Sequence, residues 1–144
     1  MEIQIITSNK LFPNSVSLLA PFIVWKKQLQ NLNINSRIIY DITKLQDSDY
    51  IILDSKFHRS FWNQSINKIF HDIKLIKKKC NKFIYFDTTD STSSLQVEVL
   101  DFVDKYWKMQ ILKNKENYLK KYYGGRIFTD HLKTLNIVDK SNSS

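Results

Sequence analysis

Short polar clusters follow the apolar runs of this sequence, and their side chains are the ones suited to chemistry. In an open α/β sheet, ligands bind beyond the carboxyl ends of the strands. The clusters that this rule selects are Thr7-Ser8-Asn9, Asp41, Asp54-Ser55-Lys56 with His58, and Asp87 to Thr92. From these clusters, the expected ligand-binding residues are Ser8, Asn9, Lys56, His58, Thr88, Thr89 and Ser91.

The richest cluster is the segment from Asp87 to Thr92, which holds two carboxylates and four hydroxyl side chains. Such residues often cap the helix that follows, because their oxygens accept hydrogen bonds from free backbone amides. They also suit contact with a ligand, since one cap needs fewer polar groups than this segment provides. The sequence leaves both interpretations open.

Two enzyme classes that use an aspartate after a strand lack a partner residue here. A phosphatase of the haloacid dehalogenase type needs an acid two positions after its nucleophile, and Thr89 stands there after Asp87. A phosphorelay receiver with Asp54 as its acceptor needs an acidic pair after the first strand to hold magnesium. Thr7 and Ser8 occupy that place. Neither activity is expected.

Cofactor and metal sites are not expected either. The only glycines are Gly124 and Gly125, and neither a dinucleotide-binding loop nor a phosphate-binding P-loop can be built from this pair. The histidines are His58, His71 and His131, which are too scattered to define a metal site.

The apolar patterns that must position these clusters alternate between strand and helix. Near-continuous apolar runs predict strands at 3–6, 36–40, 49–53 and 82–86. Helical spacing predicts a helix whose buried stripe consists of Phe22, Trp25, Leu29 and Leu32. Pro21 is expected in its first turn, and residues 11–17 are expected to be a loop or an irregular lead-in. A second helix follows with apolar residues from Phe61 to Ile76.

The order of these elements predicts one Rossmann-like α/β domain with a mostly parallel sheet of about four strands flanked by helices. A long helix is expected after the fourth strand, from Leu95 to Tyr123, and Gly124-Gly125 would end it. We expect residues 1–138 to form the domain and residues 139–144 to form a flexible tail.

Composition indicates a cytoplasmic protein. The amino terminus lacks the features of a signal peptide, no apolar run is long enough to span a membrane, and the single cysteine, Cys80, suits a reducing compartment. The net charge of +8 comes from 19 Lys against three Arg, a bias typical of AT-rich coding sequences. Nucleic acid is therefore not the partner we expect, although cations favour any anionic ligand.

The sequence resembles bacterial surface-polysaccharide glycosyltransferases loosely over most of its length and more closely within residues 86–131. The segments that carry the resemblance are 86–91, 103–112, 118–119 and the run Tyr123-Gly124-Gly125-Arg126-Ile127-Phe128-Thr129-Asp130-His131. Such enzymes generally have the two-domain GT-B arrangement, in which the amino-terminal domain faces the acceptor and the carboxyl-terminal domain holds the nucleotide sugar.

The resemblance implies that Asp87, Asp90, Arg126 and Asp130 face the cleft between two domains, with the first two as candidate catalytic acids and the last two as substrate-binding residues. The guanidinium of Arg126 suits a phosphate or carboxylate, although a surface pair with Asp130 explains it equally well. The resemblance further implies a glycan acceptor as partner, a nucleotide sugar that binds only with a second domain, and peripheral contact at the inner face of the membrane.

Two hypotheses follow. We expect an acceptor-side domain of a split or truncated glycosyltransferase, which transfers a sugar when a donor-binding domain completes it. The alternative is a basic interaction domain without catalysis that binds an anionic glycan, a membrane surface or nucleic acid.

Overall fold

The computed structural model of the protein describes residues 1–10, 12–62, 64–89, 95–122 and 134–135. Its sheet has five strands, all paired in parallel, in the order β2-β1-β3-β4-β5. The strands are β1 (Glu2–Ile6), β2 (Asn35–Ile39), β3 (Ser48–Asp54), β4 (Cys80–Asp87) and β5 (Lys105–Lys108). The α-helices are α1 (Pro13–Val24), α2 (Lys26–Asn31) and α3 (Ile66–Lys77). The 3₁₀ helices are η1 (Ile42–Lys44), η2 (Ser55–His58), η3 (Val97–Phe102) and η4 (Lys115–Leu119). The α/β fold class is confirmed.

The chain divides into two compact units. The first unit, of Met1–Thr89 and Gln96–Met109, holds the whole sheet with α1, α2, α3 and η1 to η3. The second unit, of Asp90–Leu95 and Gln110–Ser144, holds η4, in which the side chain of Asn114 accepts a hydrogen bond from the Glu116 amide at 3.0 Å. A single domain over residues 1–138 stays a prediction, and the predicted tail lies outside the described residues.

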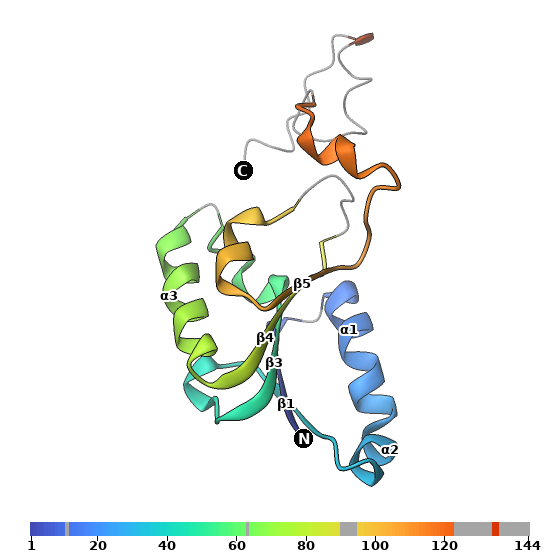
Figure 1. Ribbon diagram of the computed structural model, residues 1–144, viewed down its shortest axis with the longest axis vertical. Helices are drawn as coiled ribbons and strands as arrows, with labels where there is room; N and C mark the ends of the chain where they lie inside the picture. Colours follow the sequence, from blue (N-terminus) through green and yellow to red (C-terminus); the bar gives the residue numbers. More distant parts are fainter. Residues whose placement is uncertain (11, 63, 90–94, 123–133, 136–144) are drawn as a thin grey trace. The chain divides into compact units, whose positions relative to one another are not determined.

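Helices cover both faces of the sheet, with α1 on one side and α3 on the other (Figure 1). Leu18 and Leu19 of α1 lie in one buried cluster, with the sheet residues Ile5, Ile52 and Ile84. The cluster on the α3 side contains Ile6, Ile39, Ile51, Leu53, Ile69, Ile73, Ile76, Phe83, Tyr85 and Val99. Successive residues of one strand thus pack against different helices, which explains the continuous apolar runs of the sequence.

Helix α1 begins at Pro13, so the prediction that 11–17 is irregular and that Pro21 opens the helix is wrong. Both prolines suit a first turn, where a missing amide proton costs nothing. Burial of Leu18 and Leu19 against the sheet favours the earlier start, and Pro21 lies inside the helix.

The predicted long helix from Leu95 to Tyr123 is wrong within the described part of that range, which contains η3, β5 and η4. Strand β5 pairs with β4, with Lys105 opposite Ile84 and Lys108 opposite Asp87. The Asp104 carboxylate also accepts a hydrogen bond from the Phe83 amide at 2.7 Å. The backbone groups along β4 thereby gain partners, and this long-range pairing outweighs the helical spacing of the apolar residues.

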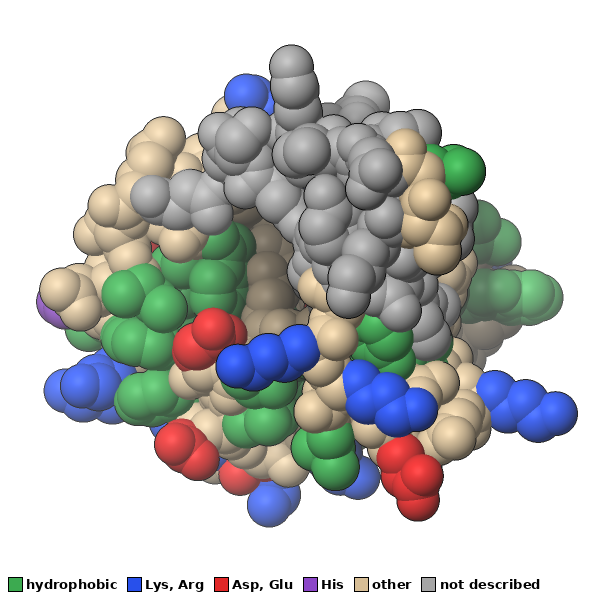
Figure 2. Space-filling model, turned by 90° about the horizontal axis from the view of Figure 1, so that it is seen from above, with side chains coloured by type: hydrophobic (Ala, Val, Ile, Leu, Met, Phe, Trp, Pro, Cys, Tyr) green, Lys and Arg blue, Asp and Glu red, His purple; other side chains and the backbone are tan. Residues whose placement is uncertain are grey.

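Charged side chains of both signs are spread over the surface. On the face visible in Figure 2, Lys and Arg side chains lie among Asp, Glu and apolar ones and form no continuous basic field. Within the described ranges, no helix is long and apolar enough to cross a membrane.

Candidate functional site

The strand order creates a crevice between the carboxyl ends of β1 and β3. These strands are neighbours in the sheet, yet the chain leaves β1 towards β2 and leaves β3 towards β4. Connections that run in opposite directions from adjacent strands leave the space between them open, and this switch point is where ligands bind in open α/β sheets.

A pocket of about 510 Å³ lies at this position, and we call it the switch-point pocket. Its lining comes from the segments after β1 and after β3, and consists of Ser8, Asn9, Lys10, Phe12, Lys56, Phe57, Arg59 and Ser60. Three of these residues are cationic and none is acidic. The guanidinium of Arg59 lies 5.0 Å from the centre of the Phe12 ring, a cation–π contact that restrains it. The lining suits an anionic ligand.

A second pocket of about 420 Å³ shares Ser8, Asn9 and Phe57 with the first. The rest of its lining is Tyr40, Asp41, Ile42, Thr43, Phe61, Lys68 and Asp72. Asp41 caps η1, and hydrogen bonds from the backbone amide and then the hydroxyl of Thr43 lower the pKa of its carboxyl group. This hydroxyl pocket, as we name it, combines carboxylates and an amide, which bind sugar hydroxyls, with aromatic rings, which pack against the apolar face of a sugar ring.

Beneath the pockets, Asp54 at the end of β3 is fully buried and joins three neighbouring elements. One oxygen, Oδ2, accepts hydrogen bonds from Thr7 Oγ1 at 2.7 Å and Ser15 Oγ at 2.5 Å. The other, Oδ1, accepts from Thr88 Oγ1 at 2.5 Å and from the Lys56 amide at 3.0 Å. Asp54 therefore fixes the ends of β1, α1 and β4 around the switch-point pocket.

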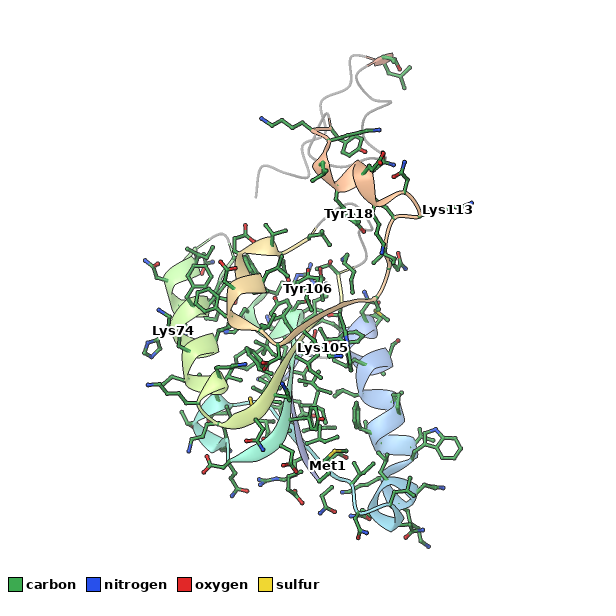
Figure 3. All side chains as sticks on the ribbon, in the orientation of Figure 1. Met1, Lys74, Lys105, Tyr106, Lys113 and Tyr118 are labelled. Atoms are coloured by element: carbon green, nitrogen blue, oxygen red, sulfur yellow. The ribbon has the colours of Figure 1, made fainter. Side chains whose placement is uncertain are left out.

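Asp87 at the end of β4 lies in a second buried network, with residues of β5. Its Oδ2 accepts from Tyr106 Oη at 2.5 Å and from Lys108 Nζ at 3.0 Å, and its Oδ1 accepts from the amide and hydroxyl of Thr89 at 2.9 and 2.6 Å. Tyr106, labelled in Figure 3, also accepts a hydrogen bond from the Gln96 amide at 3.0 Å. Burial, then the Asp87 hydrogen bond, raises the pKa of Tyr106, so its hydroxyl stays protonated.

Comparisons with protein-family models, with curated proteins and with solved structures found no match to this chain.

The structure brings together only some of the predicted ligand-binding residues. Ser8, Asn9 and Lys56 line the switch-point pocket side by side. Thr88 is buried, and its amide and hydroxyl contact Ser55 and Asp54. The side chain of Thr89 contacts Asp87 and Lys108. The remaining predicted residues, Asp90, Ser91, Arg126 and Asp130, lie outside the described residues.

His58 is fully buried and is absent from the lining of both pockets. Its Nε2 lies 3.1 Å from Asp72 Oδ2, while Nδ1 has no hydrogen-bond partner among the described residues. Burial lowers the pKa of His58, and the hydrogen bond with Asp72 opposes this effect only in part. Its contact with substrate stays a prediction, and the geometry gives it a role in packing η2 against α3.

The lowered pKa of His58 predicts a loss of stability on mild acidification. The unfolded chain takes up a proton at about pH 6.5, before folded His58 does, so the free energy of unfolding falls as pH drops below that value. One proton changes it by at most about 1.4 kcal/mol per pH unit. Urea unfolding between neutral and mildly acidic pH should show a smaller pH slope in His58→Gln. The matched change His71→Gln, at an exposed position of α3, should leave the slope unaltered.

Several residues of the site could not be predicted from the sequence. Lys10 and Arg59 lie in segments whose pocket-facing role has no sequence signal beyond their position after β1 and β3. Tyr106 and Lys108 were missed because their segment was expected to be helical. Among the described residues, no group of three or more His, Cys, Asp or Glu side chains could hold a metal ion.

Proposed function

We propose that this chain is the acceptor-side half of a glycosyltransferase and that it holds an anionic glycan acceptor at the carboxyl edge of its sheet. The observation that carries the proposal is the switch-point pocket, with Lys10, Lys56 and Arg59 in its lining and no carboxylate. A phosphate or carboxylate group of the acceptor would occupy it.

The electrostatics of the pocket support an anionic group. Arg59 offers paired donors that match a phosphate or carboxylate, and Ser8 and Ser60 add hydroxyl groups to the same lining. Three cations in one lining attract an anion more strongly than single lysines spread over the surface. An anion should therefore bind here in preference to the dispersed surface lysines.

The hydroxyl pocket supports a sugar beside that anion. Because the two pockets share Ser8, Asn9 and Phe57, one ligand with an anionic end and a sugar ring would contact both linings. Asp41 is exposed and suited to accept hydrogen bonds from sugar hydroxyls. A sugar phosphate is the smallest compound with both features.

Binding of glucose 1-phosphate tests the proposal at the level of the site. By calorimetry, glucose 1-phosphate should bind and glucose should bind at least about tenfold more weakly, since it lacks the group that pairs with Arg59 and Lys56. Arg59→Gln should weaken glucose 1-phosphate binding by about tenfold, the equivalent of one lost charge-assisted contact. Lys78→Gln, at an exposed position after α3, is the matched control and should leave it unchanged.

Equal binding of both compounds, or an equal effect of the two substitutions, would contradict the proposed site. Transfer is tested separately. A nucleotide sugar should bind poorly to this chain alone, and transfer to a glycan acceptor should appear when a donor-binding domain is co-expressed. If a folded sample binds glucose 1-phosphate but shows no transfer when that domain is present, the chain binds its ligand without catalysing transfer.

That last outcome corresponds to the second candidate function, a basic binding domain without catalysis. The net charge of +8 and the cationic pocket favour it. Nucleic acid as its ligand would show as binding that weakens steeply with added salt, because each phosphate contact releases counterions.

A further inference from the structure

The junction of α1 and α2 exposes a run of apolar side chains. Ile23, Val24 and Trp25 are consecutive and 57%, 68% and 56% exposed, and Leu32 at the end of α2 is 70% exposed. We call these four residues the α1–α2 elbow. The sequence predicts that Trp25 and Leu32 belong to a buried stripe, but α2 has no buried residue. Phe22 of that stripe packs against the buried cluster of the sheet, whereas Trp25 and Leu32 are exposed.

The elbow lies in a segment without negative charge. Between Glu2 and Asp41 the sequence has no acidic residue and four cations: Lys10, Lys26, Lys27 and Arg37. Lys26 and Lys27 follow the apolar run directly, and both are exposed. Exposed apolar residues that include tryptophan and lie beside lysines are typical of segments in the interface of an anionic membrane.

A shallow pocket of about 400 Å³ adjoins the elbow and provides a second, separate observation. Its lining is Phe22, Ile23, Lys26, Ser36, Arg37 and Ile38, so it combines apolar residues with two cations and one hydroxyl. No carboxylate is part of it. A phosphate headgroup beside an acyl chain has the matching chemistry, with its charge near Lys26 and its glycerol backbone near the apolar residues.

These observations favour a membrane over a second copy of the chain. A symmetric dimer places the same patch of both copies face to face, which would bring Lys26 and Lys27 towards their counterparts without an acid between them. Anionic phospholipids neutralise both lysines at once and also accept the exposed apolar side chains.

We propose that the α1–α2 elbow docks this chain on membranes that carry anionic phospholipids, with Trp25 and its apolar neighbours at the level of the glycerol backbones. The elbow stands at the carboxyl end of α1, whereas Phe12 at the start of α1 lines the switch-point pocket. The length of α1, about 18 Å at 1.5 Å per residue, separates the two sites. The inference therefore does not depend on the proposed function, and variants at one site leave the other intact.

Co-sedimentation of the whole chain with vesicles tests the inference. It should bind phosphatidylcholine vesicles that contain phosphatidylglycerol and bind pure phosphatidylcholine vesicles weakly. Val24→Ser with Trp25→Ala should weaken binding by about tenfold. Lys26→Gln with Lys27→Gln should also weaken it by tenfold or more, at about fivefold per lysine. The matched control, Lys78→Gln with Lys82→Gln, removes the same charge from exposed positions elsewhere and should change binding less than about twofold.

A second readout uses fluorescence and a milder substitution. Brominated lipids should quench part of the tryptophan emission of the wild-type chain, and Trp25→Phe should remove that quenching while the vesicles still bind. The inference is overturned if phosphatidylglycerol vesicles fail to bind, if the control lysine pair weakens binding as much as Lys26 and Lys27 do, or if the elbow variants change only self-association in light scattering.

Discussion

Lys108→Met is expected to lower the free energy of unfolding by about 3 kcal/mol, because it leaves the Asp87 carboxylate buried without its cation. Lys108 Nζ lies 3.0 Å from Asp87 Oδ2, and the two side chains are 2% and 0% exposed. Methionine fills a similar volume, so little of the loss comes from packing. The Tyr106 hydroxyl and Thr89 still donate to Asp87, but neither compensates a full charge. Urea unfolding followed by circular dichroism measures the loss.

Two further variants separate the ion pair from other effects. Lys105→Met removes a lysine from an exposed position of the same strand and should change stability by less than about 0.5 kcal/mol. Asp87→Asn combined with Lys108→Met leaves no buried charge, so it should be more stable than the sum of the single losses predicts. Equal losses in Lys108→Met and Lys105→Met would show that the buried pair contributes nothing.

The sheet core could be predicted because its signal is local. The apolar runs that become β1, β3 and β4 are short and near-continuous, which favours strands covered on both faces. Parallel strands bring their carboxyl ends to one edge of the sheet. Ser8, Asn9 and Lys56 do line one pocket.

The fifth strand could not be predicted because its signal is not local. Val103, Trp107 and Ile111 repeat at helical spacing, and nothing in the sequence indicates that β4 offers a free edge for Lys105–Lys108. Because this segment was predicted to be helical, the sequence also did not indicate that its residues are hydrogen-bond partners of Asp87. A carboxylate that appears in the sequence as a free acid in a polar loop is instead bonded to Tyr106 and Lys108.

The pockets depend on side chains whose direction the sequence does not specify. His58 and Arg59 are adjacent, yet His58 is enclosed between Phe57 and Phe61 while Arg59 lines the switch-point pocket over Phe12. The short helix η2 sets this difference, because consecutive residues of a helix point in different directions. The sequence therefore does not distinguish the packing of His58 from the pocket-facing position of Arg59.

Asp54→Asn is expected to lower the free energy of unfolding by about 2 kcal/mol and to weaken glucose 1-phosphate binding as well. The amide group replaces one of two oxygens that together accept four hydrogen bonds, and bonds to a charged acceptor are worth about 1.5–3 kcal/mol each. Because these bonds fix the segments after β1 and β3, their loss should let the lining of the switch-point pocket move. Unfolding in urea and calorimetry with the same variant measure the two effects.

Asp41→Asn is the matched control for the stability effect of this substitution. Asp41 follows β2 and Asp54 is the last residue of β3, and each caps a 3₁₀ helix through its side chain. Asp41 is exposed, and asparagine caps a helix about as well as aspartate does, so Asp41→Asn should preserve stability. If Thr7→Val is added to Asp54→Asn, the second loss should be smaller than in the wild-type chain, because the hydroxyl has already lost its charged acceptor. Strictly additive losses would mean that Asp54 and Thr7 act independently and that the buried carboxylate does not organise the pocket.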